Sequence, residues 1–421
     1  MTRNIAVGAL ADLVTPGELV YVPGGVTVPT AFIQDLQSDP QRSQGLRMLT
    51  SISPGLPNPL DMERLHASAV VTGLFMQPGL TQAQRSGRFR MMPMSFGGLI
   101  RHMREEVDLD LLVVQVSPPN AQGECSLGPS VEFSQLALSK ARRVLALINP
   151  NVPHYKGSVS IPYERFDYVS QAETTLPEYR TDDDAPTRAA ASHIATLIGD
   201  GSTLQMGLGK VPTALARILR DRRGLRMFSG MVSDGLMDLS NAGALDKNYE
   251  HTCCVVAGSQ ALYRWASEFD GLRVASCEVT HSPRTLSGLD RFIAVNSALE
   301  VDLLGQCNLE LADGRAISGA GGAPDFARAA RLSPGGCSIV ALNASYNSRS
   351  RGLQSRIVPR LGEPGLASLA RVDVDCIVTE FGVADLRGKS VHERAEALIA
   401  VAAEEFRDGL KQAWAETSAR L

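Results

Sequence analysis

The chain has 421 residues, of which 44% are hydrophobic and 20% are charged, a composition that excludes disorder as its main state. The formal net charge of −4 gives no sign of a nucleic acid or an anionic membrane as partner. No apolar run approaches the roughly 20 residues that a membrane-spanning helix requires. The length of the chain predicts two or three domains, each able to bury a hydrophobic core without disulfide bonds.

Seven cysteines are scattered along the chain, and none belongs to a C-x-x-C pair. The spacing therefore offers neither a zinc cage nor a thioredoxin-type motif. Free, mostly buried thiols in a reducing compartment are the simplest interpretation. Residues 1–13 lack the basic and then apolar order of a signal peptide. We expect a cytoplasmic enzyme that holds no metal.

Two similar units follow each other along the chain. Residues 16–36, PGELVYVPGGVTVPTAFIQDL, read as a turn, a short strand, a glycine-rich loop and a helix opened by Val-Pro-Thr, and residues 200–219, DGSTLQMGLGKVPTALARIL, read the same way. A second echo, GECS and then GQCN, lies 106 residues after the turn of the first unit and 104 residues after that of the second. A duplicated α/β unit explains both echoes.

Apolar runs of five to eight residues alternate with helical stretches such as 187–198; the runs are 111–116, 144–148, 338–342 and 376–383. Continuous hydrophobicity predicts strands that are covered on both faces, which is typical of parallel sheets. The polar, acidic segment 170–188 contains two prolines and is the best linker. We predict two similar open parallel-sheet α/β domains, 1–175 and 189–421, with an active-site cleft between them.

Two glycine loops are candidate ligand sites, because ligands of open α/β sheets bind beyond the carboxyl ends of the strands. Gly207-Leu208-Gly209-Lys210 lies between a predicted strand and a predicted helix, so its amides either hold an anion or form an ordinary tight turn. The loop from Ser318 to Phe326 has glycine at 319, 321 and 322, which lets the backbone approach a ligand closely. Neither loop is a Rossmann fingerprint or a P-loop.

Several carboxylates lie beside predicted strand ends, among them Glu278, Glu300, Asp302 and Glu380. Each is either a nucleophile or general base, or an ordinary cap or ion-pair partner. A G-x-S-x-G elbow and an H-E-x-x-H helix are both missing. The sequence therefore disfavours a serine hydrolase of the elbow type and a metalloprotease.

Taken together, the motifs resemble the acetyl-CoA hydrolase/transferase family, the class I CoA-transferases that include 4-hydroxybutyrate and acetate CoA-transferases. The resemblance covers nearly the whole chain in family order. It is carried by 113–133, LQMGLGKVPTAL (204–215), MVSDGLMDL (231–239), VNSALEVDLLGQ (295–306), SGAGGAPDFARAA (318–330), SRIVPRL (355–361) and VTEFGVADLRGKSVHERAEALIAVA (378–402).

The resemblance implies a reaction on an acyl-CoA thioester and a small acceptor, with coenzyme A as part of the substrate, and an assembly of two or more copies. In the family, a glutamate carboxylate attacks the thioester and then carries CoA as a glutamyl thioester. By analogy, Gly207, Gly209, Gly321 and Gly322 lie close to the thioester, with backbone amides at the oxyanion. Lys210 belongs to the same CoA-binding loop, and Asn296 and Glu380 match positions that line the active site.

The sequence departs from the family at one position. The family pattern reads S-E-M-x-S-D-G, whereas this chain reads Ser229-Gly230-Met231-Val232-Ser233-Asp234-Gly235. Glycine cannot form the acyl anhydride, so the usual covalent route is missing at this position.

Three hypotheses follow from the missing glutamate. In the first, Glu278 or Glu380 is the substitute nucleophile of a CoA-transferase. In the second, water or a small acceptor attacks the thioester directly, with one of these two glutamates as base. In the third, the protein binds acyl-CoA without catalysis.

Overall fold

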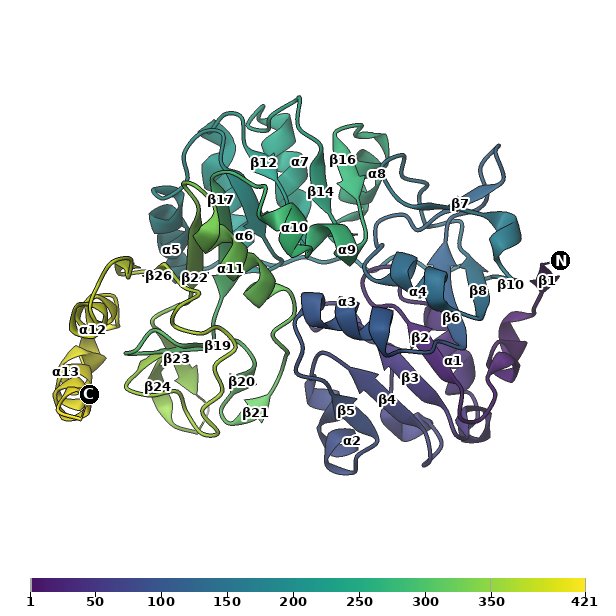
Figure 1. Cartoon of the computed structure of the whole chain (residues 1–421), viewed down its shortest axis with the longest axis horizontal. Helices are drawn as coiled ribbons and strands as arrows, with labels where there is room; N and C mark the ends of the chain where they lie inside the picture. The colour runs from purple at the N-terminus through teal and green to yellow at the C-terminus, as the bar shows by residue number, and fades with distance from the viewer. Residues whose placement is uncertain (1, 349, 421) are drawn as a thin grey trace.

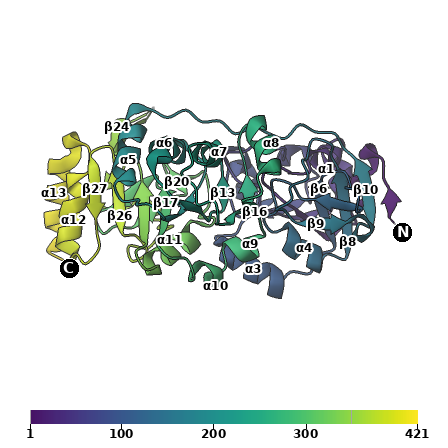
Figure 2. The same ribbon diagram turned by 90° about the horizontal axis from the view of Figure 1, so that it is seen from above.

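The computed structural model describes residues 2–348 and 350–420. Two α/β bodies lie side by side along the longest axis, the N-terminal half in purple and blue and the C-terminal half in green and yellow (Figure 1). Seen from above, the two chain ends lie at opposite ends of the molecule (Figure 2). The predicted pair of α/β domains is confirmed.

The N-terminal sheet has eight strands in the order β1-β10-β8-β6-β2-β3-β4-β5, all parallel. The strands are β1 (Arg3–Asn4), β2 (Leu19–Val22), β3 (Arg47–Thr50), β4 (Val70–Gly73), β5 (Phe89–Met91), β6 (Leu111–Val116), β8 (Arg143–Ile148) and β10 (Tyr168–Gln171). Helix α1 (Thr30–Leu36) packs on one face, and α3 (Phe96–Glu105) and α4 (Ser134–Lys140) pack on the other. The apolar run 111–116 is buried throughout because helices cover both faces.

The C-terminal sheet has six strands in the order β12-β11-β17-β22-β26-β27. They are β11 (Thr203–Met206), β12 (Arg226–Met227), β17 (Phe292–Ser297), β22 (Cys337–Ala341), β26 (Cys376–Thr379) and β27 (Gly382–Asp385). The first five are parallel, and β27 turns back antiparallel to β26. The run 376–383 is therefore not one strand as predicted, because the turn at Glu380 and Phe381 divides it.

Helices cover this second sheet as well. Helices α5 (Ala185–Ala195) and α6 (Lys210–Ile218) share a core with its strands, and α11 (Ala323–Leu332) packs against β17 and β22. Helices α12 (Val391–Ala400) and α13 (Glu404–Ser418) pack together in the core cluster that includes β26 and β27.

The remaining helices and strands are short. The helices are α2 (Thr81–Arg85), α7 (Asp234–Asn241), α8 (Gln260–Glu268), α9 (Cys277–Thr280) and α10 (Pro283–Leu286). The strands are β7 (Glu124–Ser126), β9 (Ser160–Pro162), β13 (Met231–Val232), β14 (His251–Cys253), β15 (Val255–Val256), β16 (Leu272–Val274), β18 (Glu300–Asp302), β19 (Cys307–Asn308), β20 (Leu311–Ala312), β21 (Arg315–Ala316), β23 (Ser345–Ser348), β24 (Gly352–Ser355) and β25 (Ile357–Val358).

The two sheets repeat one local arrangement. In the first, β2 pairs with β3 on one side and β6 on the other, and in the second β11 pairs with β12 and β17. Each central strand leads into a glycine loop and a helix, α1 or α6. The GECS and GQCN echoes follow β6 and β17, which are the corresponding neighbours. The sequence echoes therefore coincide with equivalent places in the two sheets.

Residues 172–184 connect the halves without regular secondary structure. The amide of Tyr179 donates to the carbonyl of Gly258, and the side chain of Gln260 donates to the carbonyl of Leu176. All seven cysteines are free and buried, as the sequence predicts. Within the described ranges, no helix combines the length and the apolar character needed to cross a membrane.

Candidate active site

A cavity of about 370 Å³ lies between the two halves. The N-terminal half contributes Ser53, Phe75, Phe96 and Glu132, and the C-terminal half contributes most of the rest, including residues of both glycine loops. A larger hollow of about 980 Å³ lies around β20, β21 and residues 350–363, but it contains none of the glycines or the asparagine that the sequence singles out. The smaller cavity is therefore the candidate site.

The first glycine loop presents bare backbone to this cavity. Strand β11 ends at Met206 and α6 begins at Lys210, so Gly207 and Gly209 form the connection. A Cβ added to Gly207 would meet no atom within 4 Å, and Gly209 has a φ of +134° that favours glycine. Gly207 lines the cavity. This loop is open to a ligand next to the N-terminus of a nine-residue helix.

Lys210 points into an ion pair rather than into the cavity wall. Its Nζ lies 2.8 Å from an Asp184 carboxylate oxygen, and both side chains are exposed to solvent. The hydrogen bond from Lys210 is the main reason why the pKa of Asp184 is well below its ordinary value. The structure brings Gly207 and Gly322 to the cavity but leaves Lys210 outside its wall.

The second glycine loop is packed tightly where the two halves meet. A side chain at Gly319 would overlap the carbonyl of Leu74, and one at Gly322 would overlap the ring of His281. Gly321 has a φ of +56° and would place a Cβ 3.2 Å from the ring of Phe75. Gly319 and Gly321 allow a close approach to the N-terminal half, and Gly322 allows a close approach to His281 of its own half. All three glycines line the cavity.

Asp325 reaches across to the N-terminal half instead of capping its own helix. Its carboxylate accepts from Ser95 Oγ at 2.9 Å and from the Gly97 amide at 3.0 Å, at the start of α3. Burial raises the pKa of Asp325, and these hydrogen bonds oppose that shift. The contact fixes the second glycine loop against α3.

Three buried polar atoms in the cavity wall have no hydrogen-bond partner among the described residues: Ser53 Oγ, Gln205 Oε1 and Asn296 Nδ2. Gln205 comes from β11 and Asn296 from β17, which are neighbouring strands. Leaving such atoms buried without a partner is costly. The wall is therefore built to receive a polar ligand, and Asn296 Nδ2 is a donor suited to a carbonyl oxygen or an oxyanion.

Glu132 is a carboxyl group in the cavity wall that the sequence did not reveal. It is buried, and its carboxylate accepts a hydrogen bond of 2.6 Å from Ser51 Oγ. Burial raises the pKa of Glu132 from its ordinary value to about 7, although the hydrogen bonds from Ser51 and from the Gly24 backbone oppose the shift. A carboxyl group with this pKa can act as an acid or a base near neutral pH.

Gly230 lies in the same wall, between β12 and β13. A Cβ at this position would lie 3.4 Å from Cε1 and Nε2 of His281 and 3.5 Å from the ring of Phe326. The imidazole of His281 is buried between the rings of Phe96 and Phe326, with centroids 4.8 and 4.5 Å away. Burial lowers the pKa of His281 to about 3, so the ring is neutral at pH 7.

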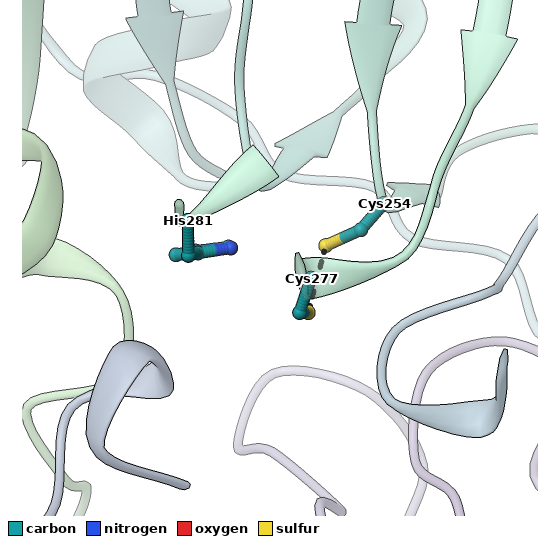
Figure 3. Close-up of side chains that lie close together, drawn as sticks. All are labelled: Cys254, Cys277 and His281. Carbon is teal, nitrogen blue, oxygen red and sulfur yellow. Dashed lines mark hydrogen bonds between the residues drawn. The ribbon is translucent and has the colours of Figure 1, made fainter. Parts of the chain in front are cut away.

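Two thiols lie close to this histidine (Figure 3). Sγ of Cys254, Sγ of Cys277 and a ring nitrogen of His281 all lie within 4.8 Å of one another. The two sulfur atoms are 3.6 Å apart, and the thiol of Cys254 donates to the carbonyl of Gly230 at 3.0 Å. Cysteine spacing gave no sign of this cluster, since the tertiary fold brings 254, 277 and 281 together. Such a donor set is of the kind that zinc prefers.

The two glutamates singled out from the sequence lie elsewhere. Glu278 pairs with Arg104 at 2.6 Å, and Glu380 accepts from the Ala344 amide at 2.8 Å in the turn between β26 and β27. Neither side chain is part of the cavity wall. Each of these two carboxylates has its partner outside the cavity wall.

The cavity between the two α/β domains, with its unpartnered polar atoms and its glycine loops, is the candidate active site of an enzyme. Residues 10–177 match the acetyl-CoA hydrolase/transferase N-terminal domain, and residues 258–414 match the C-terminal domain of the same family. The chain therefore belongs to the acetyl-CoA hydrolase/transferase family.

Individual relatives agree with this assignment. The chain is 34% identical to the 4-hydroxybutyrate coenzyme A transferase of Clostridium kluyveri, over 80% of each chain. It is 26% identical to the acetyl-CoA hydrolase of Eremothecium gossypii, over 73% of this chain and 65% of that protein. The structure of RipA from Yersinia pestis superposes with a TM-score of 0.89 at 25% identity, over 99% of this chain and 98% of that one.

Proposed function

We propose that the protein transfers an acyl group or CoA between an acyl-CoA thioester and a small acceptor, by a route that does not pass through a glutamyl-CoA at position 230. The observation that carries this proposal is Gly230 in the wall of the cavity between the halves. A residue without a side chain supplies no carboxylate nucleophile there. The family membership supports the acyl-CoA substrate.

The polar groups of the cavity can be assigned roles in this reaction. Gly207, Gly209, Gly321 and Gly322 border the thioester, and Asn296 Nδ2 donates to the oxygen that becomes negative when the carbonyl carbon is attacked. The open surroundings of Gly207 and the missing partner of Asn296 support these roles. Lys210 lies outside the cavity wall and forms an ion pair with Asp184, so it has no role in this reaction.

Glu132 is the general base that the geometry supports best. It lies in the cavity wall, whereas Glu278 and Glu380 do not. Because its pKa is raised to about 7, it takes up a proton from an attacking acceptor more readily than an ordinary carboxylate does. The buried free cysteines support the cytoplasmic location that the sequence led us to expect.

Hydrolysis is the second candidate function. A carboxyl group with a pKa of about 7 lies in the same cavity wall as a position without a side chain, which favours water as the attacking group. One experiment separates the two candidates: release of CoA from a panel of short acyl-CoAs, measured with and without added acetate. Release that requires the carboxylate and yields a new acyl-CoA identifies a transferase, and release in buffer alone identifies a hydrolase. An absence of release in both conditions would overturn the proposed function.

A further inference from the structure

The cluster of Cys254, Cys277 and His281 beside the cavity has no part in the roles assigned so far. We propose that the thiol of Cys254 is the nucleophile that takes the acyl group from acyl-CoA and holds it as an acyl-cysteine thioester. This inference rests on the proposed function, and it names the group that replaces the missing glutamate. It also states what the enzyme carries between its two half-reactions, namely the acyl group rather than CoA.

Cys254 lies beside the position that lacks a side chain. Its amide and its thiol both donate to the carbonyl of Gly230, at 2.9 and 3.0 Å. Gly230 and Cys254 are both part of the cavity wall. Cys253 precedes it in β14 and Cys277 lies next to it, but neither lines the cavity. Of the three neighbouring thiols, Cys254 is therefore the one placed to meet a bound thioester.

The groups around Cys254 suit a nucleophilic role for its sulfur atom. The Cys277 thiol donates toward Cys254 Sγ at 3.6 Å, and burial raises the pKa of Cys277 well above its ordinary value, so Cys277 keeps its proton as a donor. A ring nitrogen of His281 is directed toward the two thiols (Figure 3). Thr280 Oγ1 lies 2.9 Å from Nδ1 of His281. The Cys254 thiol thus has a hydrogen-bond donor and a histidine ring beside it at the edge of the cavity, which suits a nucleophile.

The proposed step balances without a further reactant. The bond between Cys254 Sγ and the acyl carbon forms, and the bond between that carbon and the CoA sulfur breaks. The proton of the Cys254 thiol ends on the departing CoA sulfur, which leaves as a thiol. One thioester is exchanged for another, and the acyl group then passes to water or to another acceptor, which regenerates the Cys254 thiol.

The test compares wild-type protein with Cys254→Ala and Cys253→Ala. Cys253 is the matched control because it is adjacent, fully buried and outside the cavity wall. We expect Cys254→Ala to slow CoA release from butyryl-CoA at least about 1,000-fold, the effect of losing a covalent nucleophile. We expect Cys253→Ala to retain CoA release within about threefold of wild type.

A second measurement needs no variant. Wild-type protein is mixed with butyryl-CoA, quenched in acid, digested and analysed by mass spectrometry. We expect a mass increase equal to the butyryl group, removed by hydroxylamine and assigned by fragmentation to Cys254 rather than Cys253. If no adduct accumulates and Cys254→Ala does not fold, alkylation with iodoacetamide replaces both readouts: loss of CoA release must follow the labelling of Cys254.

Several results would overturn the inference while leaving the proposed function intact. They are undiminished CoA release by Cys254→Ala, release that survives complete alkylation of Cys254, an acyl group mapped to another residue, or an adduct that contains CoA. Zinc that copurifies with the wild type and is lost in Cys277→Ala would also overturn it, because the thiolate would then be a metal ligand. Wild-type protein that releases no CoA contradicts the proposed function instead.

Discussion

The two glycine loops that follow β2 and β11 have similar sequences but opposite surroundings. After β2, a Cβ at Gly24 would lie 2.5 Å from the carbonyl oxygen of Ser51, and one at Gly25 would overlap the hydroxyl of Ser130. After β11, a Cβ at Gly207 would meet nothing within 4 Å. In the loop after β2, glycine lets other segments of the protein pack closely against the backbone. In the loop after β11, glycine leaves the backbone free to contact a ligand.

This comparison explains how a repeated unit gives an asymmetric site. The segments packed against the loop after β2 include Ser51 and Ser130. A carboxylate oxygen of Glu132 lies 3.2 Å from the Cβ position of Gly25. The loop after β2 therefore positions the carboxyl group that faces the cavity, whereas the loop after β11 offers its own amides. One copy of the unit supports the site and the other copy forms part of it.

The largest expected effect comes from a substitution in the loop after β2. Gly25→Ala combines a φ of +69° with overlap of Ser130, so we expect a loss of stability of about 3 kcal/mol. Gly207→Ala has open space around it and should change the stability by less than about 0.5 kcal/mol. Urea unfolding of both variants measures the contrast. Equal losses in the two variants would show that the loops are not different in the way the structure indicates.

The second effect concerns Glu132 and the rate. Glu132→Gln keeps the size of the side chain and removes the base, so we expect kcat for CoA release to fall about 100-fold or more. In the wild type, the rate should rise with pH and level off above the pKa of about 7, since only the ionised carboxylate accepts a proton. The variant should lack this rise. A pH profile that is the same in both proteins would remove Glu132 from the mechanism.

Glu132 also predicts how stability changes with pH. Its folded-state pKa of about 7 is higher than its ordinary value of 4.5, so its contribution to stability is lost as the pH rises from about 4.5 to about 7. The loss is on the order of 3 kcal/mol. His281, whose pKa is lowered to about 3, acts in the opposite sense and destabilises the fold as the pH falls below 6.5. Urea unfolding of Glu132→Gln at pH 5 and pH 8 should show the variant gaining stability over the wild type at the higher pH.

The smallest expected effect is at the start of α6. Lys210→Ala removes an exposed ion pair with Asp184, so kcat/KM for acyl-CoA should change by less than about threefold. Gly207→Ala, in the same loop, should lower kcat/KM by about tenfold or more, because its backbone borders the thioester. A large rise of KM in Lys210→Ala would instead assign this lysine to CoA binding.

Much of the fold could be predicted from the sequence because its signals are local. The continuous apolar run 111–116 is a buried strand along its whole length. The glycine loops after β2 and β11 each lie between a strand and a helix, as expected. The run 376–383 was misread, since a hairpin turn and a longer strand look alike when every residue is apolar except Thr379 and Glu380.

The site was less accessible to sequence reasoning because it is assembled by tertiary contacts. Glu132 adopts a positive φ of 42°, which no residue pattern announces, and its raised pKa arises from burial between segments far apart in the chain. Cys254, Cys277 and His281 have no recognisable spacing. Glu278 and Glu380 looked equally suitable in the sequence, although the fold gives both of them partners outside the cavity.

The central claim is that the protein does not carry CoA as a covalent adduct during the reaction. The most direct measurement is the intact mass of the wild type and of Gly230→Glu after each is mixed with acetyl-CoA. A glutamate should be accepted at this position, where the Cβ contacts begin at 3.4 Å. We predict no CoA adduct on the wild type, and a CoA adduct on the variant together with transfer that depends on acetate. A wild-type protein that itself carries CoA as a covalent adduct would contradict the account.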